Sequence, residues 1–524
     1  SSGSSVIEKG VIEAATVELK ANGGNIYALA GNTEGMMRAT GVMTEGGKIF
    51  LTAGDTGSVT IEKSLKAVKS DGSGGAVDVT AGTIVVSGNI DVSSTSGTGG
   101  SVYIFSEDRS EFTGTIDAFG NGSEGASGFI EVSSHKVVSI SGAVNTGVGG
   151  TFLIDPEAIT ISENDYTGSD VSYVKTSTIT GALNGGSDVI IWTRKDVAGP
   201  TDGLKKLQQG DISVEQDVLA WGGDDTSGSL VLLAMGDILV TKNIYNTGTA
   251  ASGANLTLIA GWDGETSGLG MVPSNGEGLQ TDTSWSGSIA SITSSGSKWG
   301  NSTYGGDVLI NGAHVGSRFG ATNIYANNVV VGNTGNYFND TYVGTTSSSI
   351  GFNDASGGSS FNITGDINLT AKNNITVKSN SEGAWAGIGH IGDVANRPST
   401  LGDISGNISI TAGGAILLDA KDSTTTSNAT IGHNTWTQID PNSSRGDITI
   451  QGVSLTLLGG DNNYHRALIG GHENSATVNQ AINITLSGDL VMTAGNYAYS
   501  AAQIGHVDSS LQGILTQPIT ISAA

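Results

Sequence analysis

A five-residue alternation of apolar and polar residues recurs in the C-terminal third, and no other feature limits the possible folds so strongly. Its copies span residues 365–369, 406–410, 446–450 and 481–486. A period of two is the pattern of a strand with one buried face. Each copy is followed by a second apolar segment and then by an Ile-Gly-His element or a variant of it, at 388–390, 431–433, 469–472 and 504–506. Repeats of roughly 35 to 43 residues predict a solenoid with three short strands and one variable loop per coil.

A second repeat runs from the start of the chain to about residue 162. Gly-Gly turns, or a single Gly128 in one place, precede alternating strands at steps on the order of 22 to 28 residues. The pairs are Gly23-Gly24, Gly46-Gly47, Gly74-Gly75, Gly99-Gly100 and Gly149-Gly150. A single coil cannot bury its inner face, so neighbouring coils must stack at about 4.8 Å. We therefore predict an all-β parallel β-helix.

The repeats divide the chain into four segments, with no linker clear enough to define a second domain. Long excursions from a rigid scaffold are common places for binding. The segments are 1–162 with Gly-Gly coils; 163–229, irregular, with a short helix at Thr176–Leu183 and a basic loop at Arg194–Lys206; 230–364, coils with a long Trp-rich insertion at 263–304; and 365–524 with Ile-Gly-His coils.

Charge and composition limit the partners. The formal net charge is −26, from 23 Lys and Arg against 49 Asp and Glu, so we expect no nucleic-acid partner. No cofactor is expected, although calcium stays open as an alternative. The chain has no Cys, which excludes disulfides, and it has no run of about 18 apolar residues that could form a membrane-spanning helix. Its opening, Ser1-Ser2-Gly3, suggests a piece of a longer precursor.

Five of the seven histidines are predicted to end similar Gly-containing strands, and the last four are expected to stack in successive coils. Imidazoles are common ligands of Zn²⁺ and Ni²⁺. Metal sites, however, need converging rather than collinear ligands. We therefore interpret these residues as stacked structural histidines that hydrogen-bond the next coil, and we predict no metal site. They are His314, His390, His433, His472 and His506.

Two further features are candidate binding sites. Trp262, Trp285, Trp299 and Tyr304, in or beside the insertion, can stack on sugar rings or can instead pack the insertion onto the coils. Arg445-Gly446-Asp447 is the tripeptide that integrin-binding adhesins display. Gly-Asp also starts strands elsewhere, so we interpret it as a turn. The other copies are Gly210-Asp211, Gly236-Asp237, Gly306-Asp307, Gly365-Asp366, Gly402-Asp403 and Gly488-Asp489.

The sequence favours a non-enzymatic protein, with no catalytic residues predicted. Its acidic residues are dispersed in turns, and it shows no convincing acid pair, Ser/His/Asp order, phosphate loop or metal-ligand cluster. Some parallel β-helices cleave polysaccharides, so lyase or hydrolase activity stays as a minor alternative.

An ordered set of segments between residues 7 and 262 carries a family resemblance. The segments are 24–30, 37–42, 47–53, 150–156, 159–161, 182–186, 210–214, Trp221 and 236–238. In this combination the chain resembles the large exoproteins of the filamentous-haemagglutinin type, which are exported by two-partner secretion. The repeats after residue 365 look similar. The Asn-Pro-Asn-Gly type motif of their amino-terminal secretion domain is not found here, so the chain looks like the shaft region downstream of it.

The resemblance implies a right-handed parallel β-helix (solenoid) with long loop insertions, exported with an outer-membrane secretion partner to the cell surface of a Gram-negative-type bacterium. It also implies a role in adhesion, aggregation or biofilm formation. The leading hypothesis is therefore a secreted structural surface or matrix protein. Open coil ends can pair with another copy, so self-association, end to end or lateral, is expected. The alternative is a ligand-specific adhesin that binds a cell-surface or matrix polysaccharide.

Overall fold

The computed structural model gives the backbone of most of the chain, and before residue 46 it describes the backbone only. The described residues are 6–9, 26–29, 36–39, 42–45, 47–69, 71–121, 127–164, 171–193, 210–221, 228–246, 254–263, 292–294, 298–300, 306–332, 348–350, 353–354, 363–379, 385–392, 404–420, 428–435, 445–463, 465–473, 477–478, 480–508, 514–515 and 517–524.

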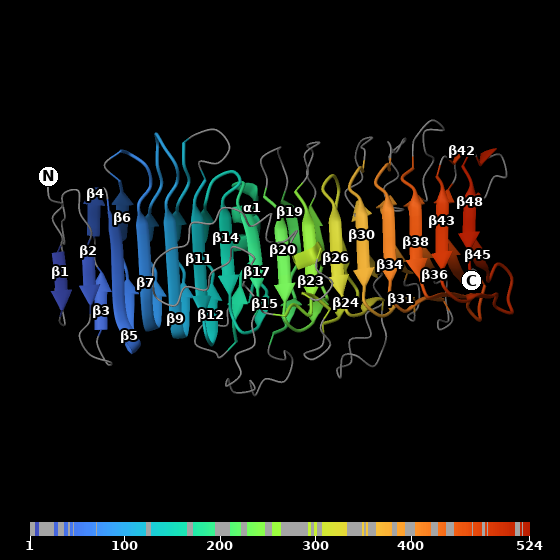
Figure 1. Ribbon diagram of the computed structural model, residues 1–524, viewed down its shortest axis with the longest axis horizontal. Coiled ribbons are helices and arrows are strands. Elements are labelled where there is room, and N and C mark those ends of the chain that lie inside the picture. The colour runs from blue at the N-terminus through green and yellow to red at the C-terminus, as the bar shows by residue number, and fades with distance from the viewer. Residues whose placement is uncertain are drawn as a thin grey trace. The chain divides into compact units, whose positions relative to one another are not determined.

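The chain groups into two compact units. Unit 1 comprises residues 1–216, 221–236 and 262–298, and unit 2 comprises residues 217–220, 237–261 and 299–524. In both units the named strands pair in parallel with strands of the neighbouring coil, for example β7 with β9 and β30 with β34. Figure 1 shows these strands side by side. The structure thus confirms the predicted all-β parallel β-helix.

Unit 1 has one long series of paired strands and one short series. The long series is β1 (Val6–Lys9), β2 (Ile26–Leu29), β3 (Met36–Ala39), β5 (Lys48–Ile61), β7 (Ala76–Val86), β9 (Ser101–Phe112), β11 (Phe129–Ser134), β12 (Val137–Ile140), β14 (Thr151–Asp155), β15 (Ile159–Ile161), β16 (Tyr173–Val174), β17 (Asp188–Trp192), β18 (Ile212–Val214) and β20 (Leu230–Ala234). The short series is β4 (Val42–Glu45), β6 (Ser64–Val68), β8 (Asn89–Asp91), β10 (Thr115–Asp117) and β13 (Ala143–Asn145).

Unit 2 has three ladders of strands, one strand of each per coil. The first ladder is β23 (Leu256–Ala260), β26 (Thr322–Ala326), β30 (Ile367–Ala371), β34 (Ile408–Ala412), β38 (Ile448–Gly452), β43 (Ile482–Leu486) and β48 (Ile519–Ser522). The second is β21 (Ile238–Val240), β24 (Val308–Ile310), β27 (Val329–Val331), β31 (Ile375–Lys378), β35 (Ala415–Asp419), β39 (Ser454–Leu458) and β44 (Leu490–Thr493). The third is β19 (Val218–Trp221), β22 (Ile244–Asn246), β25 (His314–Ser317), β28 (Ser348–Ile350), β32 (Trp385–Ile388), β36 (Asn428–Ile431), β40 (Arg466–Ile469) and β45 (Ala502–Ile504).

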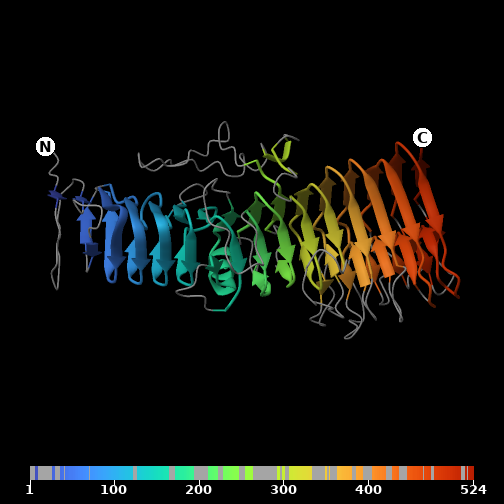
Figure 2. The ribbon, with the colours of Figure 1, turned by 90° about the horizontal axis from the view of Figure 1, so that it is seen from below.

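This arrangement confirms the three strands per coil that the C-terminal repeat predicts. The yellow to red arrows in Figure 2 are the stacked strands of residues 299–524. The structure adds very short strands after the third ladder, namely β29 (Asn353–Asp354), β33 (Ile391–Gly392), β37 (Asn434–Thr435), β41 (His472–Glu473), β42 (Thr477–Val478), β46 (Val507–Asp508) and β47 (Ile514–Leu515).

The core of unit 2 consists of columns of identical or similar aliphatic side chains. Ile408 pairs in register with Ile448, and Ile410 pairs with Ile450. All four are at most 1% exposed. Because side chains alternate between the two faces of a strand, the intervening polar residues point outward. Burial of each such side chain stabilises the fold by about 1.5–3 kcal/mol.

Asp and Asn side chains at the turn before each first-ladder strand tie one coil to the next. Asp366 Oδ1 accepts the backbone N–H of Asn407 at 2.7 Å, and Asn407 Oδ1 accepts that of Asp447 at 3.0 Å. Asp447 Oδ1 in turn accepts the N–H of Ala481 at 2.8 Å. Each side chain therefore satisfies a backbone donor at the corresponding place in the following coil, which fixes the register between coils.

The second ladder uses the same device. Asp237 Oδ1 accepts the N–H of Asp307 at 2.9 Å, and Asp307 Oδ1 accepts that of Asn328 at 3.0 Å. The series continues from Asn328 to the N–H of Asn374 at 3.1 Å and from Asn374 to that of Ala415 at 2.9 Å. The Gly-Asp pairs that end in Asp237, Asp307, Asp366 and Asp447 are therefore structural turns, as the sequence predicts. Gly402-Asp403 lies outside the described residues.

The irregular segment contains the expected helix. Helix α1 (Thr176–Asn184) confirms the prediction for Thr176–Leu183. Its inward side chains, including Ile179 and Leu183, are buried. The basic loop predicted at Arg194–Lys206 lies outside the described residues. No helix among the described residues combines the length and the apolar character that a bilayer span requires.

We predict that Ile410→Ala lowers the free energy of unfolding of unit 2 by about 2–5 kcal/mol, because it leaves a cavity in a fully packed column. Urea denaturation followed by circular dichroism measures this change. The matched control is Ser409→Ala, the adjacent outward residue, for which we expect a change within about 0.5 kcal/mol. Equal effects of the two substitutions would contradict the assignment of inward and outward faces.

Candidate functional site

Two of the predicted histidines form a buried ring stack in unit 2. The imidazoles of His390 and His433 are parallel within 6°, with centroids 5.2 Å apart. Both residues are 0% exposed. Nε2 of His390 lies 2.7 Å from the carbonyl oxygen of Gly365, and Nε2 of His433 lies 2.9 Å from that of Gly406. Both histidines follow third-ladder strands, so these contacts connect the third ladder to the turns that precede the first-ladder strands.

The hydrogen bonds define the protonation state of His433. Its Nδ1 accepts the backbone N–H of His390 at 3.2 Å, so Nδ1 carries no proton. Nε2 then carries the proton and donates it to the Gly406 carbonyl. Burial lowers the pKa of His390 to about 4. Burial, followed by the nearby His390 and Arg445, lowers the pKa of His433 well below its usual value. These histidines are neutral structural groups at pH 7.

The backbone conformation requires the first glycine in each Ile-Gly-His element and in its variants. Gly389, Gly432, Gly470 and Gly505 all have positive φ, between 125° and 150°. A side chain at Gly432 would also collide with the backbone of Gly470 in the next coil. Residues with a Cβ adopt such a φ only with strain. The close approach of neighbouring coils therefore explains the glycine of the Ile-Gly-His pattern without a bound ligand.

The expected stack of four histidines is wrong for His472. The N–H of Gly471 donates to Nδ1 of His506 at 3.0 Å, so Gly471 occupies the place that histidine has in the other coils. His472 instead pairs with Asn434 and Val507. The extra glycine in 469–472 moves the histidine one residue along the strand, and a one-residue shift reverses the face that a side chain occupies.

His314 also lies outside this stack. The prediction that it ends a strand is wrong, because His314 is the first residue of β25. It pairs with Ser349, whose Oγ is 2.7 Å from its Nδ1. Burial lowers its pKa to about 4. Sequence reasoning missed His465, which is likewise 0% exposed. It precedes β40 and does not end a Gly-containing strand, so the repeat gave no signal for it.

The Arg445-Gly446-Asp447 tripeptide is not displayed for recognition. Arg445 is 5% exposed. Its backbone forms an isolated parallel β-bridge with Ile404, which forms another with Ile363. It thus occupies a position that is isoleucine in the two preceding coils. Asp447 belongs to the inter-coil series of turns. The structural interpretation of this motif is supported.

The structure places two of the four candidate sugar-binding aromatics in buried environments. Trp262 is 0% exposed and its ring centroid lies 5.0 Å from that of Trp192. Trp299 is 5% exposed, packs edge-on against Tyr325 at 5.5 Å, and has the Lys372 ammonium 5.4 Å from its ring centroid. Neither ring offers a free face, so both are corrected from ligand-binding to packing residues. Trp285 and Tyr304 lie outside the described residues.

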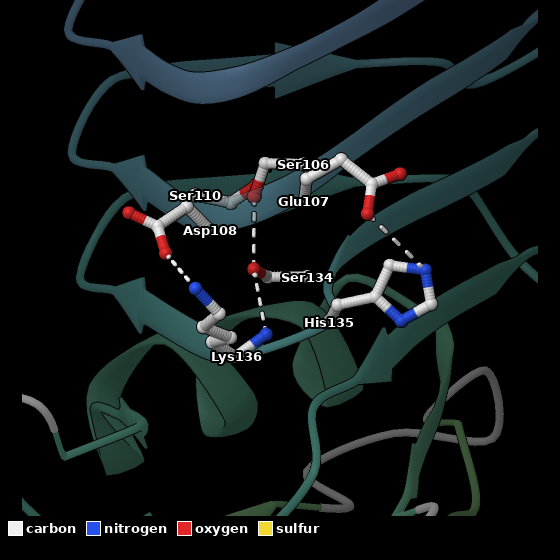
Figure 3. Close-up of polar contacts among 7 residues, drawn as sticks. All are labelled: Ser106, Glu107, Asp108, Ser110, Ser134, His135 and Lys136. Carbon is white, nitrogen blue, oxygen red and sulfur yellow. Dashed lines mark hydrogen bonds and ion pairs between the residues drawn. The ribbon is translucent and has the colours of Figure 1, made fainter. Parts of the chain in front are cut away.

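A polar cluster in unit 1 was not predicted (Figure 3). Ser110 Oγ donates to Ser106 Oγ, and Ser106 Oγ donates to Ser134 Oγ, both at 2.9 Å. These three serines are at most 3% exposed. They lie at the bend within β9 and at the corresponding bend between β11 and β12. Their hydrogen bonds therefore join neighbouring coils. The signal for them was weak, because serine is common throughout the chain.

One ion pair and one histidine–carboxylate contact lie on the outer side of the same bend. Lys136 Nζ is 2.6 Å from Asp108 Oδ1, and His135 Nε2 is 3.6 Å from Glu107 Oε2. His135 is 44% exposed, whereas the serines are buried. Figure 3 draws contacts of serine with serine, of lysine with aspartate and with Ser134, and of histidine with glutamate. None of these contacts joins a serine to His135, so they do not form the relay that nucleophilic catalysis uses. The cluster is a connection between coils, and its exposed ion pairs contribute about 0–1 kcal/mol each.

One carboxyl group has a strongly shifted pKa. Burial, with the charge of Asp307 as a smaller cause, raises the pKa of Asp237 to about 6. Among the described residues, no group of three or more His, Cys, Asp or Glu side chains is arranged so that it could hold a metal ion. No protein-family model and no curated protein matches the chain.

We predict that acidification destabilises unit 2. The unfolded chain binds protons at these histidines near pH 6.5, whereas folded His390 does so only near pH 4. The contribution of these histidines to stability is therefore complete above about pH 6.5 and falls as the pH drops toward 4. The melting temperature as a function of pH measures this loss. We expect a smaller loss in His433→Gln and an unchanged loss in His135→Gln, the exposed control. Identical profiles for wild type and His433→Gln would refute this account.

We also predict that Asp447→Asn leaves both the melting temperature and integrin-dependent cell attachment unchanged. The asparagine keeps the Oδ1 acceptor for Ala481, as Asn407 does in the preceding coil, but it removes the carboxylate that an integrin needs. Attachment of integrin-bearing cells to the immobilised protein measures the effect. A selective loss of attachment, without a loss of stability, would show that the tripeptide is recognised after all.

Proposed function

We propose that this protein is a secreted structural protein of a bacterial cell surface or extracellular matrix, which mediates adhesion, aggregation or biofilm formation without enzymatic activity. One observation carries the proposal: the same inward columns and the same turn hydrogen bonds recur coil after coil, as with Ile408 and Ile448 or Asn407 and Asp447. A coil that repeats its own contacts can be added many times at the same energetic gain per coil. Such an architecture suits reach and contact area.

The resemblance to exoproteins of the filamentous-haemagglutinin type supports the same proposal by analogy. Under it, an outer-membrane secretion partner delivers the protein to the surface of a Gram-negative-type bacterium. Parallel strands form few contacts within a coil and many between coils, so the coil edges also favour association with further copies, end to end or lateral. The surplus of 26 negative charges opposes binding to nucleic acid.

The second candidate function is a glycan-binding adhesin. Its original basis, the aromatic residues of the insertion, is weakened by the burial of Trp262 and Trp299. A different surface, on the outer side of the first ladder, favours it instead. Polysaccharide cleavage has less support, since the serines near His135 are buried and form hydrogen bonds with each other.

The proposal predicts that adhesion depends on the intact stack of coils. In the producing cells, Val377→Asp places a charge at a position that is 0% exposed, so we expect loss of the surface protein and of cell aggregation. The matched control is Thr376→Asp, the adjacent outward residue of β31, for which both are retained. Immunogold electron microscopy and a settling assay measure the two outcomes. A label confined to the cell interior, or aggregation unaffected by Val377→Asp, would contradict the proposed function.

A further inference from the structure

The outer face of the first ladder in unit 2 is uniform in chemistry. Three consecutive strands, β34, β38 and β43, each present two outward residues, and all are uncharged hydrogen-bonding side chains. Their register forms two straight rows across the coils. One row is Ser409, Thr449 and Asn483, and the other is Thr411, Gln451 and Thr485. We call these six residues the polar face.

The side chains of the polar face are available to an external partner. Ser409, Thr411, Gln451 and Thr485 are exposed, and Thr449 and Asn483 are half-exposed. None of the six forms a side-chain hydrogen bond to another residue of the described chain. The turn residues beside them differ, because Asn407 and Asp447 use their side chains to hold the coils together. The donors and acceptors of the polar face therefore contribute little to the fold.

The second ladder of the same coils has a mixed surface. Aliphatic Leu417 and Leu458 occur among its outward positions, and Asp419 Oδ2 lies 3.6 Å from Nζ of Lys378 in the preceding coil. Uniformity is thus a property of the polar face and not of every outward surface of unit 2. The strand position alone does not impose it either, because the neighbouring strand β35 carries Leu417 and Asp419 at outward positions.

We propose that the polar face binds an uncharged, extended polysaccharide. Rows of hydroxyl and amide groups at a spacing of about 4.8 Å on a parallel sheet present hydrogen-bond partners at regular intervals. A polymer of sugar hydroxyls repeats its own partners in the same way. The face has no charge to pair with a charged polymer, and the net charge of −26 repels polyanions. This inference rests on the proposed surface function and names the partner class and the residues that contact it.

The test is sedimentation of the purified full chain with particles of cellulose, chitin or mannan, with alginate beads as the polyanion. We expect retention by at least one of the three uncharged polymers and none by alginate. The triple substitution Thr411→Ala, Gln451→Ala and Thr485→Ala removes three hydrogen-bonding groups and should weaken binding about tenfold or more.

The matched control is Thr376→Ala, Thr456→Ala and Thr493→Ala, three outward threonines of the second ladder, which should bind like wild type. Melting curves check that both variants fold. Failure to bind any of the three polymers overturns the inference, as does equal weakening by the two triple variants or preferential retention by alginate. Self-association that only the polar-face variant abolishes would assign the face to a second copy instead.

The proposed function is tested separately by immunogold location and cell aggregation. A protein that is found at the surface and supports aggregation, yet binds none of the polymers, therefore overturns this inference and leaves the proposed function in place.

Discussion

Hydrogen bonds between the backbones of neighbouring coils are the interaction on which the rest of the structure depends. A coil of three short strands has no partner strand within itself, so its N–H and C=O groups can be satisfied only by the coils before and after it. This requirement aligns equivalent residues into columns. Isoleucine then meets isoleucine inside, as at Ile410 and Ile450. At the turns before the first-ladder strands, Asp366 and Asn407 each accept a backbone N–H from the next coil. The same register produces the ring stack of His390 and His433.

The sequence was sufficient to predict the strands, the coils and the short helix, because each depends on a local pattern. Alternation predicts β34 and β38, and the Gly446-Asp447 pair predicts the turn before β38. Predictions of side-chain environment were less successful. The burial of Trp262 against Trp192 joins segments far apart in the chain, and no local pattern reports it. The displacement of His472 depends on a single extra glycine, which changes the face without interrupting the repeat. The serines of the unit 1 bend were missed because their role appears only when coils are stacked.

The architecture separates stability from surface chemistry. Inward columns, turn residues and buried histidines hold the coils together, so the outward residues of the first ladder are free to vary without a large cost in stability. In β34, β38 and β43 the outward residues are nevertheless all uncharged and able to form hydrogen bonds. That contrast supports a functional role for the outer face, whereas the buried histidines and Arg445 belong to the framework. A solenoid also repeats any surface property along its length, so weak contacts can add up over several coils.

In-register stacking is the central claim, and spin labelling tests it most directly. The chain has no cysteine, so cysteines introduced at Ser409 and Thr449 carry the only two nitroxides. In-register neighbours place the two backbones about 4.8 Å apart, whereas a pair at Ser409 and Asn483 spans two steps, about twice that distance. Electron paramagnetic resonance should show strong dipolar broadening for the first pair and clearly weaker broadening for the second. Equal spectra for the two pairs, or no broadening for the first, would contradict the stacked parallel coils.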